Sequence, residues 1–578
     1  MLPLRSLGRA APLGLALGFF VTPAQASPVM IAGEGTEKVH STHVSILKQP
    51  GTSAVSIMPD YQGSLSPFSL IIAIPSDVGL DQVIGLKREF IDRLDNITAP
   101  KFAEFWEQDP CDPTPVQQEW QRDLTAKAAN GFLGTVETGP TQKVAKELLM
   151  DMKSQAKKGE YAFSILDAAG VSAHLQKRGL KLPTGGQESL TSYEGQGFKF
   201  LVADVETGRV ELVGGNRAQL SPIRFVTSSD YSNIPARFGL PSAAAKQELY
   251  IFTLVPDQRT QVKNYPTKAA PTNWVVSFDI KEKMGEFYAA LHDRYLEKNP
   301  KTFLLEYAYP SWDCGKPCPN ERLLPHELLS LGGDAIDAKL PESERRPAPA
   351  PLTPEEEAQQ KTVAEGKTPK EKKELEKQWK IDREELAARK ATLARHRYIL
   401  SRLHYRYDAA SLPTDIELGG GAAVTGGVAL PEGEMGAADT SVTAAPENAL
   451  QTRFNHVHPD ISVLKCEKPE RYRWGKSPRT YRGLNKIWVA EDLSRKKRDK
   501  IKLEDVVFTP VPDLGIPGKA VTAKKEAAPV EAPAAPVEEK KGGLCSFAVP
   551  ELSQTGLGLV WSAMGLAVLA RRRKNKKA

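Results

Sequence analysis

The run Phe68-Ser69-Leu70-Ile71-Ile72-Ala73-Ile74-Pro75 is almost continuously apolar and stops at a proline. A short apolar run without alternation is typical of a β-strand that is buried on both faces. Upstream, residues 39–57 contain two apolar segments on either side of Gln49-Pro50-Gly51, which predicts two short strands around a turn. We therefore expect the fold to be built on a sheet with a buried central strand.

The segments that follow mix helical and strand patterns. Apolar residues at helical spacing predict helices at 81–94, 101–107, 167–178 and 282–298. Gly179 is suited to the left-handed C-cap of the third helix. Looser alternation predicts strands within 198–213, which would form a hairpin, and at 249–255 and 274–280. This mixture predicts an α+β fold, with an antiparallel-rich sheet and packed amphipathic helices.

Three segments differ from the rest in composition. Residues 335–400 begin with a Pro-rich linker and continue with a stretch dense in Glu, Lys, Arg and Ala. That stretch predicts a long charged helical insertion, broken near residues 366–369, which is either a solvated projection or a partner-binding coiled coil. Residues 419–445 are rich in Gly and Ala and predict a flexible loop. Residues 511–543 predict a disordered stalk of Ala, Pro, Lys and Glu.

The N-terminal segment has the pattern of a secretory signal peptide. Arg5 and Arg9 flank the start of an apolar stretch that leads to Ala24-Gln25-Ala26. This pattern predicts a signal peptide over residues 1–26, with cleavage between Ala26 and Ser27.

The C-terminal segment, residues 544–578, has the pattern of a membrane-stop signal. The nineteen uncharged residues 552–570 are followed by Arg571, Arg572, Arg573 and Lys574. A membrane-spanning helix needs about 20 residues, and a basic cluster is held on the cytoplasmic side. We therefore expect a hydrophobic helix that contacts the membrane.

That arrangement resembles the tripartite C-terminal sorting signals of bacterial surface proteins, most closely the myxobacterial type (MYXO-CTERM). The resemblance implies that processing or lipid attachment occurs at Cys545. A permanent single-span anchor is the alternative. Either way, we expect an exported protein that is membrane-anchored or at the cell surface of a Gram-negative-type bacterium.

The basic excess of the chain lies in these two terminal segments. The formal charge is +6, of which residues 1–26 supply +2 and residues 552–578 supply +6. Residues 27–551 therefore carry about −2, and the charge gives no argument for nucleic-acid binding.

Five cysteines occur in the chain. Without Cys545, four remain in an oxidising compartment, and four cysteines allow three pairings. We favour Cys314 with Cys318, across the short turn Cys-Gly-Lys-Pro-Cys, and Cys111 with Cys466. A zinc site is the competing interpretation of the close pair, but no His/Cys pair lies nearby at zinc spacing.

Candidate catalytic residues are few. On a strand, the spacing of two places His456 and His458 on one face, where they could hold a metal with a carboxylate such as Asp460. Glu104, Glu107 and Asp109 surround Trp106 and could form a glycosidase-like acid pair, or be ordinary surface charges. The motifs of serine hydrolases, P-loop proteins, zincins and dinucleotide-binding proteins are missing from the sequence. We expect no cofactor.

Several blocks, in order, resemble the bacterial "domain of unknown function 2330" family (DUF2330). They begin with YQGSLSPFSLIIAIPSDV (residues 61–78) and continue with GEYAFSILDAAGVSAHLQKRGLKLP (159–183), LSPIRFVTSSDYSNIPARFGL (220–240), YAYPSWDCGKPCP (307–319), SRLHYRYDAASLPTDIEL (401–418) and LQTRFNHVHPD (450–460). The resemblance implies a domain formed by residues 27–334 and 401–510, interrupted by the charged insertion. It also implies export and no assigned activity.

Together these patterns predict an exported, envelope- or surface-anchored protein that acts as a structural or partner-binding module, with an extracytoplasmic protein as its partner. The alternative is an extracytoplasmic hydrolase or metal-dependent enzyme that uses His456 and His458.

Overall fold

The computed structural model describes residues 28–64, 66–112, 160–210, 212–214, 217–312, 323–475, 488–489 and 501–519. The predictions that concern Ala26, Ser27, Cys314, Cys318, Cys545 and residues 571–574 lie outside these ranges. Within them, no helix is both long and apolar enough to cross a bilayer. The hydrophobic segment 552–570 is not among them.

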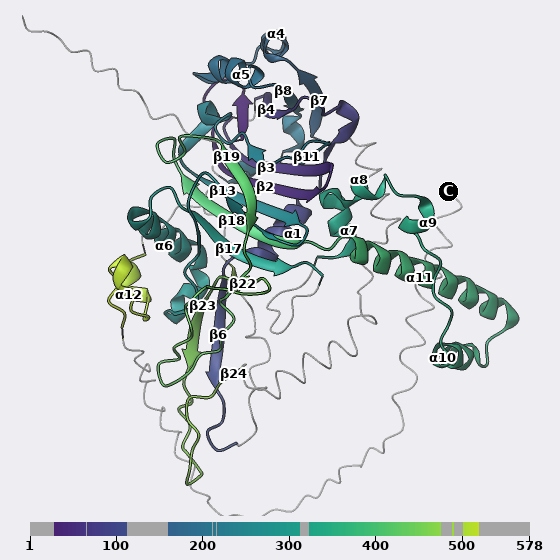
Figure 1. Cartoon of the computed structure of the whole chain (residues 1–578), viewed down its shortest axis with the longest axis vertical. Coiled ribbons are helices and arrows are strands. Elements are labelled where there is room, and N and C mark those ends of the chain that lie inside the picture. Colours follow the sequence, from purple (N-terminus) through teal and green to yellow (C-terminus); the bar gives the residue numbers. More distant parts are fainter. Residues whose placement is uncertain are drawn as a thin grey trace, which may run out of the picture. The chain divides into compact units, whose positions relative to one another are not determined.

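A large mixed sheet forms the centre of the described chain (Figure 1). The predicted pair at its middle is confirmed: β2 (Val39–Gln49) and β3 (Thr52–Gln62) form an antiparallel hairpin. β13 (Ala243–Val255) runs parallel to β2, and β18 (Ile399–Tyr407) and β17 (Phe303–Pro310) continue the sheet with antiparallel pairing. Shorter strands complete it: β5 (Val83–Gly85), β9 (Leu212–Gly214), β10 (Arg217–Gln219), β11 (Ile223–Thr227), β15 (Thr267–Ala269), β20 (Val424–Gly426), β21 (Thr443–Ala444) and β22 (Ala449–Gln451).

The apolar run at 68–75 is a buried strand, as predicted. It forms β4 (Phe68–Pro75), which lies between β1 (Val29–Ala32) and β8 (Phe198–Val205), with β7 (Tyr161–Leu166) at the edge. One apolar face of this four-stranded sheet packs against α4 (Ala168–Arg178) and α5 (Gly186–Glu194). Helix α4 ends at Gly179, whose φ of 71° is left-handed, as the sequence predicts.

Two small sheets position the sites considered below. One contains β12 (Asn233–Ile234), β14 (Arg259–Val262) and β19 (Ile416–Gly421). The other contains β16 (Trp274–Val275), β23 (Arg453–His458), β6 (Lys101–Glu107), β24 (Trp474–Gly475) and β25 (Trp488–Val489). The predicted amphipathic helix α6 (Met284–Lys298) covers this second sheet through Met284, Phe287 and Leu291.

The charged insertion contains two exposed helices. α10 (Pro354–Ala364) and α11 (Pro369–Arg395) lie on either side of Gly366, whose φ is 73°. Only Ala388 and Thr392 are buried among the described residues of α11, so most of its surface faces solvent. The remaining helical segments are α1 (Glu89–Thr98), α7 (Pro325–Leu328), a π-helical turn (Leu329–Gly333), α8 (Asp334–Asp337), α9 (Glu342–Arg345), α12 (Leu503–Val506) and 3₁₀ turns at Leu80–Gln82, Thr207–Arg209, Leu240–Ser242, Phe278–Glu282 and Pro512–Leu514.

Two helix predictions need correction. Residues 101–107 form strand β6, because the segment pairs in parallel with β23, about 350 residues away, and this long-range pairing overrides the helical spacing of Phe102 and Phe105. The helix predicted at 81–94 begins only at Glu89, because residues 83–85 pair with β11 as a strand.

Some strand and loop predictions also differ from the structure. β8 pairs with β4 and β7 rather than with β9, so residues 198–213 do not form a hairpin. The strand predicted at 274–280 ends at Val275, because a 3₁₀ turn follows. Residues 419–445, predicted as a flexible loop, contain the end of β19 together with β20 and β21.

The first residues of the segment predicted as a stalk are folded. Leu514 and Ile516 are buried in the apolar cluster beside α6, and Val511 and Ile516 form a β-bridge. Residues 511–519 therefore belong to the folded part, and residues 520–543 lie outside the described ranges.

Candidate functional site

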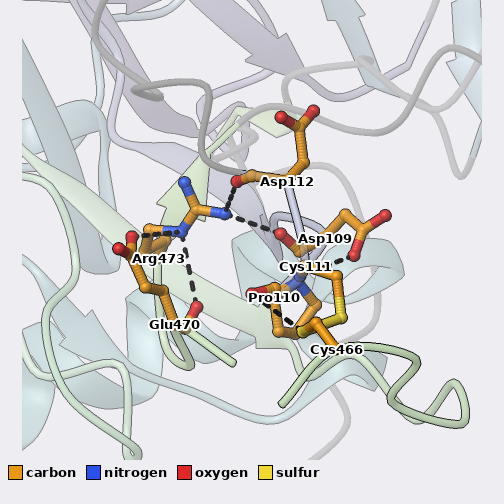
Figure 2. Close-up of a disulfide and its surroundings, with 7 residues drawn as sticks. All are labelled: Asp109, Pro110, Cys111, Asp112, Cys466, Glu470 and Arg473. Carbon is orange, nitrogen blue, oxygen red and sulfur yellow. Dashed lines mark hydrogen bonds and ion pairs between the residues drawn. A yellow bond between two sulfur atoms is a disulfide. The ribbon is translucent and has the colours of Figure 1, made fainter. Parts of the chain in front are cut away.

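A disulfide fastens the end of β6 to the chain that follows β23 (Figure 2). Cys111 and Cys466 are joined, with a Cα–Cα distance of 5.5 Å and a sequence separation of 355 residues. Four cysteines allow three sets of pairs, and this disulfide belongs to the set that the sequence analysis favours. Its partner prediction, Cys314 with Cys318, lies outside the described residues.

The disulfide stands at the base of a loop, residues 459–466, which we call the tethered loop. Arg473 donates to the carbonyl oxygens of Asp109 (2.6 Å) and Asp112, and forms an ion pair with Glu470 (Figure 2). The amide of Glu470 donates to the carbonyl of Pro110 at 2.8 Å. These contacts hold the segment that follows the loop, residues 470–473, against the end of β6.

Glu107 fixes the same loop from inside. Its side chain is fully buried and accepts two hydrogen bonds from the guanidinium of Arg471, at 2.8 and 3.1 Å. The backbone amides of Asp460 and Tyr472 also donate to this carboxylate, at 2.8 and 2.6 Å. Four donors therefore occupy the oxygens of this carboxylate, which holds the backbone of the loop in place. Because its oxygens are occupied in this way, Glu107 does not fit the role of a glycosidase acid.

The outer part of the tethered loop presents aliphatic side chains to solvent. Ile461 is 73% exposed, Val463 is 85% exposed and Leu464 is 39% exposed. Single exposed apolar residues are ordinary on a protein surface, but a group within four residues of a fixed loop is a candidate contact surface. Sequence reasoning missed it, although the I-S-V-L pattern between Asp460 and Cys466 is visible in the sequence.

The structure brings His456 and His458 together as predicted. Their rings lie on one face of β23 with centroids 4.7 Å apart. Nδ1 of His456 donates to the carbonyl of Val276 at 2.8 Å, and burial lowers the pKa of His456 to about 4. Trp106 stacks on His458 at 4.4 Å.

The carboxylate beside these histidines differs from the predicted one. Oε2 of Glu104 lies 3.0 Å from Nε2 of His458, and Lys281 forms an ion pair with Oε1 of Glu104 at 2.9 Å. Asp460 instead accepts a hydrogen bond from the amide of Ser462. Burial raises the pKa of Glu104, but hydrogen bonds from His458 and Lys281 and their charges lower it overall. Across the described ranges, no three His, Cys, Asp or Glu side chains are grouped so as to hold a metal.

A second polar cluster, which the sequence analysis missed, is buried on one face of β18. His404 contacts Oε1 of Glu306 at 2.6 Å through Nδ1 and Oε2 of Glu248 at 2.9 Å through Nε2. Burial lowers the pKa of His404, but the two carboxylates raise it overall, so both ring nitrogens donate. Arg402 pairs with Glu306 at 2.5 Å and Arg406 pairs with Glu248.

Two further carboxylates and a tyrosine contact the charged groups of this cluster. Asp95 pairs with Arg402 and Asp293 pairs with Arg406, each at 2.5 Å. Tyr288 donates to Glu306 at 2.7 Å. Burial raises the pKa of Glu306, but the charges of His404 and Arg402 lower it to about 2. Since its central charges are buried and paired, the cluster fits a structural role. Its signal in the sequence is the alternation Arg402, His404, Arg406, which places three cations on one strand face.

Comparisons with known proteins identify a family but no activity. Residues 23–419 match the family described as "Uncharacterized protein conserved in bacteria (DUF2330)". No curated protein matches the chain. The crystal structure of baculovirus P35 is similar over 49% of this chain and 76% of that chain, at 9% identity and a TM-score of 0.17, which is too low to support an argument. Because the family match spans well over half of the sequence, the chain belongs to the DUF2330 family of bacterial proteins.

Proposed function

We propose that this protein is an exported, envelope- or surface-anchored binding module that contacts a protein partner through the tethered loop. The carrying observation is the exposure of Ile461, Val463 and Leu464 on a loop whose base is fixed by the Cys111–Cys466 disulfide. Removal of apolar surface from water is the dominant favourable term in most protein–protein associations. A loop that is already ordered loses less conformational entropy on binding.

The sequence features at the two ends of the chain support the export part of the proposal. A signal-peptide pattern at residues 1–26 and an apolar run with a basic end at 552–578 are typical of a chain that is secreted and retained. The intact mass of the native protein from fractionated cells tests this part. A mass that begins at Ser27 and ends near Cys545, or at Ala578 in a membrane fraction, is expected. A mass that retains residues 1–26 would contradict export.

Site-specific photo-crosslinking in the native cells tests the binding surface. A photoreactive residue at position 463 is expected to form a defined adduct with one protein, and the same residue at the exposed position Lys199 on β8 serves as the matched control. Changing Ile461→Ser and Leu464→Ser together is expected to abolish the adduct. Equal adducts from both positions, or adducts with lipid alone, would contradict a protein partner at this loop.

The competing function is a metal-dependent enzyme that uses His456 and His458. In the structure these rings are engaged by the Val276 carbonyl and by Glu104. Metal analysis of the purified protein separates the two proposals. Stoichiometric zinc or manganese that is lost in a His456→Ala/His458→Ala variant would favour the enzyme over the binding module.

A further inference from the structure

A cavity of about 220 Å³ lies where the central sheet meets the small sheet of β12, β14 and β19. Its walls come from β2, β13, β14, β19 and the segment 230–232, and they carry more cationic than anionic groups. Lys48, Arg259 and Lys263 line the cavity, whereas Asp230 is the one carboxylate among its lining residues. The lining therefore has a surplus of two positive charges.

Part of this charge is already neutralised. Lys48 forms an ion pair with Asp230 and donates to the hydroxyl of Ser232 at 2.9 Å. Burial raises the pKa of Asp230, but hydrogen bonds from Lys48 and Ser232, together with the charges of Lys48 and Lys263, lower it overall. The surplus positive charge thus rests on Arg259 and Lys263.

A backbone hydrogen bond orients the guanidinium of Arg259, a residue of the cavity wall. Nε of Arg259 donates to the carbonyl of Ala422 at 2.6 Å, which orients the guanidinium, but its Nη1 has no acceptor. Because Nη1 is enclosed by the protein, it is not among the groups that the cavity offers to a ligand.

Three consecutive glycines in β19 make room for the side chains of the wall. A Cβ on Gly419 would lie 2.3 Å from Lys263, one on Gly420 would lie 2.0 Å from Gln258, and one on Gly421 would lie 2.6 Å from Nη1 of Arg259. None of these glycines has a left-handed backbone. A side chain at these positions would displace the ends of Lys263, Gln258 and Arg259, whereas the backbone conformation of the strand does not itself require glycine.

We propose that this cavity binds a tetrahedral oxyanion, a phosphate or sulfate group, through the guanidinium of Arg259 and the ammonium of Lys263. A guanidinium and an ammonium are the side chains that bind such groups through charge-assisted hydrogen bonds. The volume suits a free ion or the head of a small ester. This inference is independent of the tethered loop, because it concerns different residues and a different ligand.

Calorimetric titration of the exported chain, with its disulfide intact, tests the site. Inorganic phosphate, sulfate and methyl phosphate are titrated separately, with sodium chloride at matched ionic strength as the reference. Saturable binding of phosphate that sulfate competes with, and chloride does not, is expected. Binding of methyl phosphate in the same site would identify an ester head as an accepted ligand, and its failure would restrict the site to the free ion. No saturable heat with either ion up to about 10 mM, a concentration well above a millimolar dissociation constant, would overturn the proposal.

Substitutions tie the binding to these residues. Arg259→Gln and Lys263→Gln are each expected to weaken phosphate at least about tenfold, whereas Lys199→Gln, an exposed lysine on β8, leaves the affinity unchanged. Gly420→Ala is expected to weaken it as well, since the new methyl displaces Gln258. If the Arg259→Gln variant does not fold, the Lys263→Gln variant still tests the site, because Lys263 is exposed. Equal affinities of Lys263→Gln and Lys199→Gln would overturn the proposal.

Discussion

Two buried histidines that lie side by side, His292 and His404, have clearly shifted pKa values. Their rings meet edge to face at 4.5 Å. His404 is held as a cation by Glu248 and Glu306, so the charge of His404 adds to burial in lowering the pKa of His292 well below its ordinary value. Neither ring nitrogen of His292 has a hydrogen-bond partner in the described chain. The pKa values of these two neighbouring rings are therefore shifted in opposite directions.

The His292 ring gives a prediction about pH. An unfolded histidine has a pKa of about 6.5, and its folded value here is lower, so the unfolded state binds more protons as the pH falls below that value. Folding stability should then fall between pH 6.5 and pH 5, by up to about 1.4 kcal/mol per pH unit from this one group. The pKa of His404 is raised in the folded state. Its contribution to folding stability is therefore fully present below pH 6.5 and is lost only as the pH rises through the pKa of the folded state.

Urea unfolding of the wild type and of His292→Leu at several pH values measures this effect. The difference between the two profiles isolates His292, because every other group is common to both. The wild type is expected to lose stability relative to the variant as the pH falls from 6.5 to 5. Parallel profiles would show that His292 is not held neutral in the folded protein.

Gly332 occupies a backbone position that a larger residue does not fit. Gly332 lies in the π-helical turn with φ at 133°, and a Cβ there would lie 2.2 Å from the Cβ of Ala54 on β3. Gly332→Ala is expected to lower the free energy of unfolding by about 3 kcal/mol or more, from backbone strain and overpacking together. Gly208→Ala is the control, because nothing lies within 4 Å of its Cβ position. Thermal unfolding of both variants checks the prediction, and equal melting temperatures would contradict it.

At the scale of helices and strands, the sequence correctly predicted the elements that are determined by residues within a single segment. The β2–β3 hairpin, the buried strand β4, the glycine-capped helix α4 and the amphipathic helix α6 all follow from periodicity and turn residues within one segment. The errors occur where a distant segment decides. Residues 101–107 form strand β6 because β23 pairs with them. Residues 511–519 are folded because Leu514 and Ile516 pack in the apolar cluster beside α6.

The candidate sites divide in the same way. The shared face of His456 and His458 follows from a strand period of two, but their neighbour Glu104 comes from β6, whose strand character the sequence did not reveal. The oxyanion cavity joins Lys48, Arg259 and Gly420, which come from three strands and more than 350 residues of chain. Its glycines suggested a flexible loop because their packing partners cannot be read from composition.

The helical arm gives a prediction at the element scale. Thr368 and Glu371 form a capping box at the start of α11, and Thr353 and Glu356 form one at the start of α10. Thr368→Ala is expected to remove about 1 kcal/mol of local helix stability. Because the first turns of α11 are exposed, the melting temperature of the whole protein should not change. Hydrogen exchange is expected to rise only in peptides from the start of α11.

The variant Thr353→Ala is the matched control, since it should raise exchange in α10 alone. A fall in the melting temperature of either variant would mean that the arm is part of the cooperative core. Such a result would argue against a solvated projection.

For the molecule as a whole, the described chain is closed by pairing between segments about 350 residues apart. β6 at residues 101–107 lies in parallel beside β23 at 453–458, and the Cys111–Cys466 disulfide follows directly beyond them. The family match ends at residue 419, so the strand that pairs with β6, the second cysteine and the tethered loop all lie beyond the matched range. The proposed binding surface therefore depends on this closure.

This closure predicts how the molecule responds to reduction. A disulfide that spans 355 residues removes more freedom from the unfolded chain than one that closes a short loop, and the chain-entropy model gives about 6 kcal/mol for a loop of this length. Cys111→Ser/Cys466→Ser is expected to lower the free energy of unfolding by an amount of that order, and reductant should have the same effect on the wild type. Cys314→Ser/Cys318→Ser, which removes at most a five-residue loop, is the control and should cost clearly less. Denaturant unfolding of both variants, with and without reductant, makes the comparison. If the two variants lose equal stability, the Cys111–Cys466 bond does not constrain the chain as its position implies, and the tethered loop would then lack the fixed base on which its proposed role depends.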